Sequence, residues 1–280
     1  MGKTRLDLAL VERGLVSSRS LAQRLVMAGQ VRVAGQLVIK PATKIQPGVQ
    51  IDIDKGPRFV SRGGEKLAAA LEAFHVSIKG AVCADVGSST GGFTDCMLQH
   101  GVERVYAIDV GHGILVWKLR NDPRVVVMER TNARYVEQLP EPVDFVTVDV
   151  SFISLKKLLT MTKNWFTPLP PITSSSPSSS ETGRERNASV IALIKPQFEA
   201  GRTEVKRGKG VIKDPAIHRQ VLEDILSFTL DEGYEIKGLI RSPLLGPKGN
   251  TEFLVHLQYP AEISESIETL ITSVIPEEVT

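Results

Sequence analysis

Cysteine is scarce in this sequence, and its scarcity argues against two classes of site. The chain of 280 residues has only two cysteines, Cys83 and Cys96. Two cysteines are too few for a disulfide framework, and their setting is unlike the spacing of a zinc site. We interpret both as small apolar residues, and we expect the protein to work in a reducing, cytoplasmic compartment.

Long apolar runs are also absent. No uninterrupted apolar segment approaches the roughly 20 residues that a transmembrane helix needs. Residues 1–14 carry acids and have no long apolar core, so we expect no cleaved signal peptide and no membrane partner. With 42% hydrophobic and 24% charged residues, the chain can form one large domain and a small one.

Positive charge is concentrated at one end of the chain. Residues 1–60 contain ten Lys or Arg against four Asp or Glu, a net charge of +6, whereas the remainder carries 24 against 28, or −4. A small basic module on a mildly acidic body is typical of proteins that bind a polyanion. The alternative interpretation is a solvated basic face that keeps the protein in solution.

The basic segment has the pattern of a small domain of helices and strands. Apolar spacing predicts a helix that ends near Gly14, and the serines at 17–18 can cap a second helix over residues 19–28. A hairpin over residues 31–39 and a strand over residues 49–53 should follow.

This segment resembles the RNA-binding domain first described in ribosomal protein S4. The resemblance rests on residues 5–38, which read RLDLALVERGLVSSRSLAQRLVMAGQVRVAGQLV. Domains of this kind bind structured RNA through basic helices set against a small sheet. The resemblance therefore implies RNA binding, and the arginines that we expect to contact RNA are Arg5, Arg13, Arg19 and Arg24.

From Val60 onward the pattern changes to strands that alternate with helices, which is typical of a parallel α/β sheet. We expect a doubly wound, Rossmann-like sheet whose last two strands form a hairpin, with one antiparallel strand at the end. The seven candidate strands are residues 81–85, 104–109, 125–129, 145–150, 190–195, 234–242 and 251–259. The domains expected are a small α+β domain over 1–58, a linker over 59–63 and an α/β domain over 64–280.

A glycine-rich turn, GSSTGG at residues 87–92, follows the first strand of this sheet. Glycine lets the backbone approach a ligand closely, and Asp109 at the end of the next strand can accept hydrogen bonds from ribose hydroxyls. The turn is not GxGxxG and the sequence has no GxxxxGKS/T loop, so a cofactor without a pyrophosphate fits best. A tight turn or a solvated acid would explain either feature alone, but not both well.

Six motifs of the α/β domain resemble those of the TlyA family and occur in the same order. They read DVGSSTGGFTD, AIDVGHG, RTNAR, DFVTVDVSFISL, ALIKPQFE and GNTEFL. Members of this family, also called haemolysin-like proteins, are S-adenosylmethionine-dependent ribosomal RNA 2′-O-methyltransferases related to FtsJ (RrmJ). The resemblance implies a class I methyltransferase fold, ribosomal RNA or ribosomal subunits as partners, and a cofactor site lined by Asp85, Gly87, Ser88, Asp109 and Asn132.

Four charged residues should meet at one edge of the sheet. Ligands of open α/β sheets bind outside the carboxyl ends of the strands, and Asp149 and Lys195 each end a predicted strand. Glu252 begins the antiparallel strand and Lys66 opens the helix before the first strand, which places both at the same edge. FtsJ-type enzymes use a Lys-Asp-Lys-Glu tetrad, and these four positions match it.

Methyl transfer suits this set of charges. A ribose 2′-hydroxyl is a weak acid, so the reaction needs a base or a group that stabilises the developing charge. A lysine acts as a base only when burial or a neighbouring cation lowers its pKa. By family resemblance Lys195 is the base, and we assign Lys66 to holding the substrate. Asp149 and Glu252 would orient the two ammonium groups, and no metal is expected.

One segment departs from the family pattern. Residues 167–187, TPLPPITSSSPSSSETGRERN, are rich in Ser and Pro with little to bury, so we expect a disordered insertion. It should enter the strand at 190–195 from its amino end, opposite the predicted chemistry, and leave catalysis unchanged.

Two other classes of function compete with the methyltransferase. One is a non-catalytic RNA-binding or ribosome assembly factor that keeps the cofactor pocket, and the other is a membrane-active haemolysin, as the older family name suggests. All four tetrad positions are filled, which argues against the first. The sequence has no strong amphipathic basic helix of the lytic type, which argues against the second.

Overall fold

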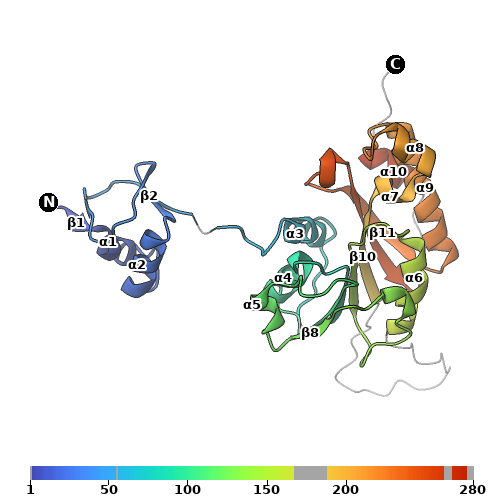
Figure 1. Ribbon diagram of the computed structural model, residues 1–280, viewed down its shortest axis with the longest axis horizontal. Coiled ribbons are helices and arrows are strands. Elements are labelled where there is room, and N and C mark those ends of the chain that lie inside the picture. Colours follow the sequence, from blue (N-terminus) through green and yellow to red (C-terminus); the bar gives the residue numbers. More distant parts are fainter. Residues whose placement is uncertain (1, 55, 167–187, 262–266, 276–280) are drawn as a thin grey trace, which may run out of the picture. The chain divides into compact units, whose positions relative to one another are not determined.

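The computed structural model describes residues 2–54, 56–166, 188–261 and 267–275. Contacts divide the chain into two compact units, Met1–Arg58 and Phe59–Thr280, whose helices and strands are drawn in Figure 1. The insertion expected at residues 167–187 lies outside the described residues.

The first unit is a small α+β domain. Its elements are β1 (Thr4–Arg5), α1 (Leu6–Glu12), α2 (Arg19–Met27), β2 (Val31–Val33), β3 (Gln36–Leu37), β4 (Lys44–Ile45) and β5 (Ile51–Ile53). β2 pairs antiparallel with β3 and β5, and β1 pairs with β4. Ser18 caps α2, because its hydroxyl oxygen accepts a hydrogen bond from the Leu21 N–H at 3.3 Å. Both expected helices and the expected hairpin are present, and the β1–β4 pair is an addition.

The second unit is built on one sheet of seven strands. Its elements are α3 (Gly63–Ala73), β6 (Val82–Val86), α4 (Gly92–Gln99), β7 (Arg104–Ile108), α5 (Trp117–Arg120), β8 (Val125–Met128), η1 (Ala133–Tyr135), β9 (Phe145–Val148), α6 (Lys156–Thr162), η2 (Lys163–Trp165), β10 (Ala188–Ile194), α7 (Pro196–Glu199), α8 (Arg202–Arg207), α9 (Pro215–Asp231), β11 (Glu235–Arg241), η3 (Pro247–Gly249), β12 (Phe253–Tyr259) and α10 (Ile267–Val274).

The strand order of this sheet is β11-β12-β10-β9-β6-β7-β8. The five strands β10, β9, β6, β7 and β8 run parallel to one another, whereas β12 is antiparallel to both β10 and β11. The predicted doubly wound sheet with an antiparallel last strand is therefore confirmed. The strand ends differ from the expected ones by at most two residues.

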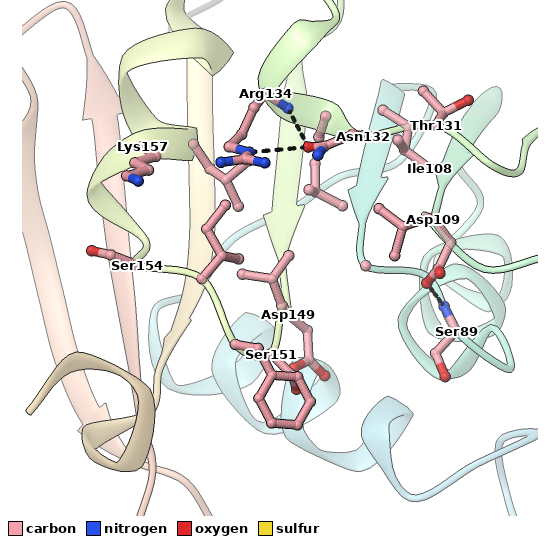
Figure 2. Close-up of a pocket in the computed structure, with 18 residues that line it drawn as sticks. Ser89, Ile108, Asp109, Thr131, Asn132, Arg134, Asp149, Ser151, Ser154 and Lys157 are labelled. Atoms are coloured by element: carbon pink, nitrogen blue, oxygen red, sulfur yellow. Dashed lines mark hydrogen bonds between the residues drawn. The ribbon is translucent and has the colours of Figure 1, made fainter. Parts of the chain in front are cut away.

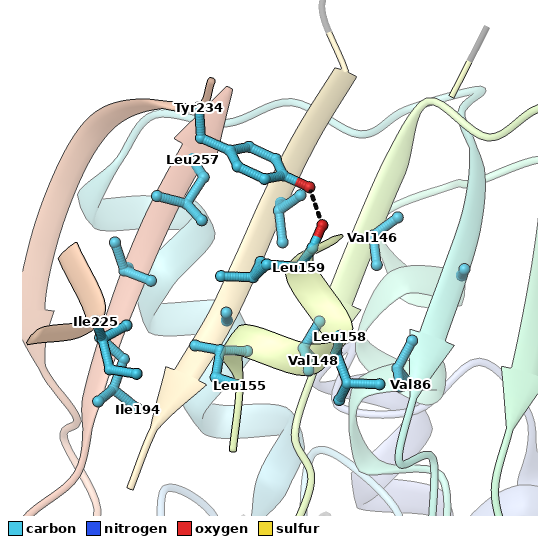
Figure 3. Packing of buried hydrophobic residues seen from close by; sticks show 14 of the residues in the cluster. Val86, Val146, Val148, Leu155, Leu158, Leu159, Ile194, Ile225, Tyr234 and Leu257 are labelled. Atoms are coloured by element: carbon cyan, nitrogen blue, oxygen red, sulfur yellow. Dashed lines mark hydrogen bonds between the residues drawn. The ribbon is translucent and has the colours of Figure 1, made fainter. Parts of the chain in front are cut away.

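Helices cover both faces of the sheet, with α3 and α4 on one side and α6 and α9 on the other (Figure 1). Successive side chains of a strand point to opposite faces. Val190 and Ala192 of β10 accordingly lie in one core with α6 and α9, while Ile191 lies in the other core with α3 and α4. Figure 3 shows the first core, where the Tyr234 hydroxyl donates to the Leu159 carbonyl oxygen at 2.8 Å. Among the described helices, none is long and apolar enough to cross a membrane.

Residues 59–63, expected as a linker, contact the second unit. Phe59 is buried, and a Cβ added at Gly64 would lie 2.3 Å from its ring. The Val60 N–H donates to Asp95 Oδ2 at 2.9 Å. This segment therefore has fixed neighbours at the start of α3, where Lys66 lies.

Candidate active site

The carboxyl ends of the parallel strands form the edge at which the predicted catalytic residues meet. β6 and β9 pair with Val86 opposite Val148, and Val148 also lies opposite Ala192 of β10. β12 runs the other way and begins beside the end of β10, where Phe253 pairs with Ile194. The residues that follow β9 and β10 and the residue that precedes β12 therefore lie at one edge.

Lys195 directly follows β10, is buried, and is held by three acceptors. Its Nζ lies 2.5 Å from Asp149 Oδ1 and donates to the Val150 carbonyl oxygen at 2.9 Å and to Ser151 Oγ at 3.3 Å. The centre of the Phe198 ring is 5.8 Å from Nζ. An ammonium group has three N–H donors. The segment after β9 can therefore engage all three and fixes the position of the nitrogen.

A second ion pair joins Lys66 and Glu252. Lys66 Nζ, from the first turn of α3, lies 2.5 Å from Glu252 Oε2, and Gln197 Nε2 donates to Oε1 of the same carboxylate at 3.0 Å. The whole residues are 9% and 1% exposed, so the pair is desolvated. Gly246 makes room for it, because a Cβ there would lie 2.0 Å from Glu252 Oε1.

Both ion pairs line one cavity of about 380 Å³. Lys66, Asp149, Lys195 and Glu252 thus meet although they come from four separate segments. Gln197, two residues after Lys195, donates to Glu252, so the segment that carries Lys195 also contacts the second pair. In the described parts of the chain, no three His, Cys, Asp or Glu side chains are grouped so as to hold a metal ion.

A larger cavity of about 560 Å³ adjoins this one, since Gly87, Ser89, Asp149 and Ser151 line both. Figure 2 shows Asp109 and Asn132 on one side of the larger cavity and Lys157 on the other. Cavities of roughly 300–1,000 Å³ with a few polar groups are typical of small-molecule sites. This cavity is therefore the candidate cofactor site.

Asp109 and Asn132 each fix a loop at the rim of the larger cavity. Asp109 accepts from the Ser89 N–H at 2.8 Å and from the Gly111 N–H at 2.7 Å. Asn132 Oδ1 accepts from the backbone N–H and from Nε of Arg134, at 3.2 and 3.3 Å. A carboxylate has about four acceptor positions, so Asp109 keeps capacity for the hydroxyls of a ligand.

Gly87 is required by the close approach of two strand ends. Its φ is +84°, and a Cβ at this position would lie 2.4 Å from the Asp149 carbonyl oxygen. Only glycine adopts this conformation readily, and any side chain would collide with the backbone after β9. At position 87, which lines both cavities, the chain therefore presents only backbone.

Gly87, Asp109 and Asn132 line the larger cavity, whereas the other two predicted cofactor residues, Asp85 and Ser88, do not. Asp85 has no exposed surface and lines neither cavity. Its carboxylate accepts from Thr94 Oγ1 at 2.6 Å and from Thr147 Oγ1 at 2.9 Å, and burial raises its pKa to about 6. Ser88 is buried and lines the smaller cavity. Asp85 therefore ties β6 to α4 and β9 beneath the site.

The four arginines predicted to contact RNA all lie in the first unit. Arg5 and Arg19 both donate to the carboxylate of Asp7. The Arg13 guanidinium donates to the carbonyl oxygen of Val49. Arg24 is exposed on α2.

Sequence reasoning missed four residues of these sites: Ser151, Phe152, Gln197 and Asp7. Phe152 lines the larger cavity, is 90% exposed and has a φ of +66°, which is uncommon for a residue with a large side chain. Only Asp7 could have been found from the sequence, because it is a charged residue beside Leu6 on the apolar face of the first helix. Ser151 and Phe152 lie in the loop after β9, and Gln197 lies in the four-residue helix α7, and neither segment is long enough for periodicity to show the direction of a side chain.

Comparison with known proteins places both units in described families. Residues 59–259 match the FtsJ-like methyltransferase family, and residues 4–51 match the S4 domain. YqxC of Bacillus subtilis strain 168 is 45% identical over 283 residues, which cover 99% of this chain and 91% of that protein.

Two further relatives span almost the same length. TlyA of Mycobacterium tuberculosis strain H37Rv, named a 16S/23S rRNA (cytidine-2′-O)-methyltransferase, is 41% identical over 260 residues, covering 91% of this chain and 90% of that protein. A solved structure of a candidate hemolysin from Streptococcus thermophilus is 40% identical, covers 98% of this chain and 95% of that chain, and has a TM-score of 0.69. The resemblance drawn from the six motifs is confirmed: the chain belongs to the TlyA family, in which an S4 domain is followed by an FtsJ-like methyltransferase domain.

Proposed function

We propose that the protein transfers a methyl group from S-adenosylmethionine to a ribose 2′-hydroxyl of ribosomal RNA. The observation that carries this proposal is the juxtaposition of two ion pairs, Lys195–Asp149 and Lys66–Glu252, in a cavity that adjoins a larger one. The S4 domain and the name of the related TlyA support an RNA substrate. We further propose ribosomal subunits as the form in which the RNA is met, and the cytoplasm as the location.

The larger cavity fits S-adenosylmethionine. Gly87 adds no side chain to its lining, Asp109 offers acceptors for ribose hydroxyls, and Asn132 lines the wall. The Ser-rich turn at residues 87–92 carries no phosphate-binding pattern, in keeping with a cofactor that has no phosphate. Bound S-adenosylmethionine supplies a methyl group on a positively charged sulfur.

Lys195 is the proposed base. In its neutral form Nζ accepts the proton of the 2′-hydroxyl as that oxygen becomes the nucleophile. Asp149 Oδ1 and the Val150 carbonyl hold the nitrogen at a fixed place both before and after it gains the proton. Deprotonation and nucleophilic attack then require little rearrangement of the site.

Lys66 is proposed to hold the substrate oxygen. Its ammonium group lies in the same cavity as Lys195 and can stabilise negative charge that develops on the ribose oxygen. Glu252 fixes this ammonium group, and Gln197 fixes Glu252. Each lysine thus has its own carboxylate, which lets the two act in different roles.

The direct test is methyl transfer to isolated ribosomal subunits. The full chain is incubated with methyl-labelled S-adenosylmethionine and with small or large subunits from bacteria that lack the corresponding gene. We expect label in one or both ribosomal RNAs, and mass spectrometry of the nucleosides should place it on a ribose. Label on a base would contradict the reaction, and RNA binding with no label on either subunit would favour the assembly factor.

Replacing Asp109 by Asn should weaken use of the cofactor. The amide has only one acceptor oxygen for the Ser89 and Gly111 N–H groups and the ligand, and its NH₂ group would face a donor. Losing a charge-assisted hydrogen bond costs about 1.5–3 kcal/mol, so KM for S-adenosylmethionine should rise roughly 10- to 100-fold. Asp122→Asn removes the same charge outside both cavities and should leave this KM unchanged.

A further inference from the structure

Asp7 is a buried carboxylate inside the most basic part of the chain. It has no exposed surface and lies in the first turn of α1. Arg5 donates to it through Nε and Nη2, both at 3.0 Å, Arg19 through Nε at 3.0 Å, and Gln23 through Nε2 at 2.9 Å. The adjacent Arg5 guanidinium holds the pKa of this carboxyl well below its usual range. Asp7 is therefore ionised and fully engaged.

The two arginines come from different elements but share this one acceptor. Arg5 ends β1 and Arg19 begins α2, and their side chains are 39% and 53% exposed. Asp7 takes only the Nε group of Arg19 and one side of the Arg5 fork. The outer N–H groups of both guanidiniums therefore remain for another acceptor, and two positive charges around one negative charge leave a surplus.

The composition of the first unit narrows what that acceptor is. Residues 1–58 contain no Phe, Trp, Tyr or His. Proteins read unpaired RNA bases largely by stacking them on aromatic rings or on guanidinium planes, and they hold the backbone through Arg and Lys contacts to phosphate. A planar guanidinium matches phosphate in a two-point contact. Contact with phosphate is therefore the chemistry that this unit offers best.

We propose that Asp7 is a positioning residue that holds Arg5 and Arg19 as a preformed pair for a phosphate of the RNA substrate. This inference rests on the proposed function. An arginine that is already fixed loses less conformational freedom when it binds than a freely moving one. The alternative is that the Asp7 bonds only hold α1 against α2.

The two explanations predict opposite changes in RNA affinity for the variant Asp7→Asn. If Asp7 only holds α1 against α2, a variant that stays folded keeps only the effect of charge. Losing a negative charge beside a surface that binds a polyanion should then tighten binding. If Asp7 positions the arginines, binding to purified 16S and 23S ribosomal RNA should instead weaken, with Kd rising about 5- to 10-fold, because the arginines no longer meet the phosphate in a fixed geometry. Glu12→Gln is the matched control: it is exposed on the same helix, makes the same charge change, and should bind as tightly as the wild type or slightly tighter.

Three further readouts exclude a merely structural effect. KM for RNA in methyl transfer should rise with kcat unchanged, because the chemistry lies in the other unit. The slope of log K against log salt should fall by about one for each phosphate that the variant no longer neutralises. In the Asp7→Asn background, Arg19→Gln should cost less affinity than in the wild type, since the pair is already disordered.

Asp7→Glu keeps the charge but misplaces it, and should also weaken binding. Hydrogen exchange over α1 and α2 shows which variants keep the unit folded. Only the RNA affinities of the folded variants test the inference. Binding by a folded Asn or Glu variant as tight as that of Glu12→Gln would overturn the inference while leaving methylation intact. A wild type that binds neither RNA would overturn the proposed substrate and this inference together.

Discussion

Lys195→Ala should lower kcat for methyl transfer by at least about 100-fold, since a positioned base contributes roughly 10²- to 10⁴-fold. The second unit should still fold, because the Asp149 side chain left behind is 24% exposed and can be hydrated. KM for S-adenosylmethionine should change little, as Lys195 does not line the larger cavity. Single-turnover rates with saturating RNA and cofactor measure the effect on chemistry alone.

Two companion variants separate a base from a fixed charge. Lys195→Arg keeps the positive charge, but a guanidinium does not give up its proton in proteins. A base at this position therefore predicts that the arginine variant is as inactive as alanine. Retention of more than about a tenth of the wild-type rate would show instead that charge is what Lys195 supplies. Lys79→Ala, which removes an exposed lysine outside both cavities, should leave the rate unchanged.

The sheet and its active edge could be predicted because both follow from where apolar runs stop. A buried parallel strand reads as a continuous apolar run, and parallel strands end on one edge. The ends of the runs at Asp149 and Lys195 therefore placed two residues together without any knowledge of their side chains. The antiparallel direction of β12 then brought Glu252 to the same edge.

Asp85 shows the limit of that reasoning. Its strand was expected to end at Asp85, but β6 continues through Val86. Since side chains alternate along a strand, Asp85 belongs to the paired part of the sheet and points to a covered face, where Thr94 and Thr147 take its oxygens. A shift of one residue in the position where a strand ends therefore decides whether a side chain can reach a ligand or is buried beneath the site.

The pairing of charges could not be predicted either. The sequence placed two lysines and two acids at one edge, but which carboxylate serves which ammonium depends on loops. Lys195 pairs with Asp149 because the turn after β9 brings Val150 and Ser151 to the same nitrogen. Lys66 pairs with Glu252 because Gly246 leaves space for that carboxylate.

Breaking the Lys66–Glu252 pair on one side should destabilise the second unit by about 3–5 kcal/mol, the usual cost of leaving one buried charge without its partner. Lys66→Met does this, because the Glu252 side chain has no exposed surface. Both tryptophans of the chain, Trp117 and Trp165, lie in the second unit. Urea unfolding followed by tryptophan fluorescence therefore reports on that unit, and the midpoint should fall without a change in slope.

The double variant Lys66→Met/Glu252→Gln separates stability from chemistry. It removes both charges and keeps an acceptor for Gln197, and replacing a buried ion pair by neutral groups of similar size is often neutral for stability. We expect most of the lost stability to return while methyl transfer stays at least about 100-fold below the wild type, as removing one charge-stabilising group typically costs 10²- to 10³-fold. A double variant that recovers its activity along with its stability would assign the pair to the fold alone. Lys195→Ala is the reference for this comparison, because its activity should be lost while the second unit stays folded.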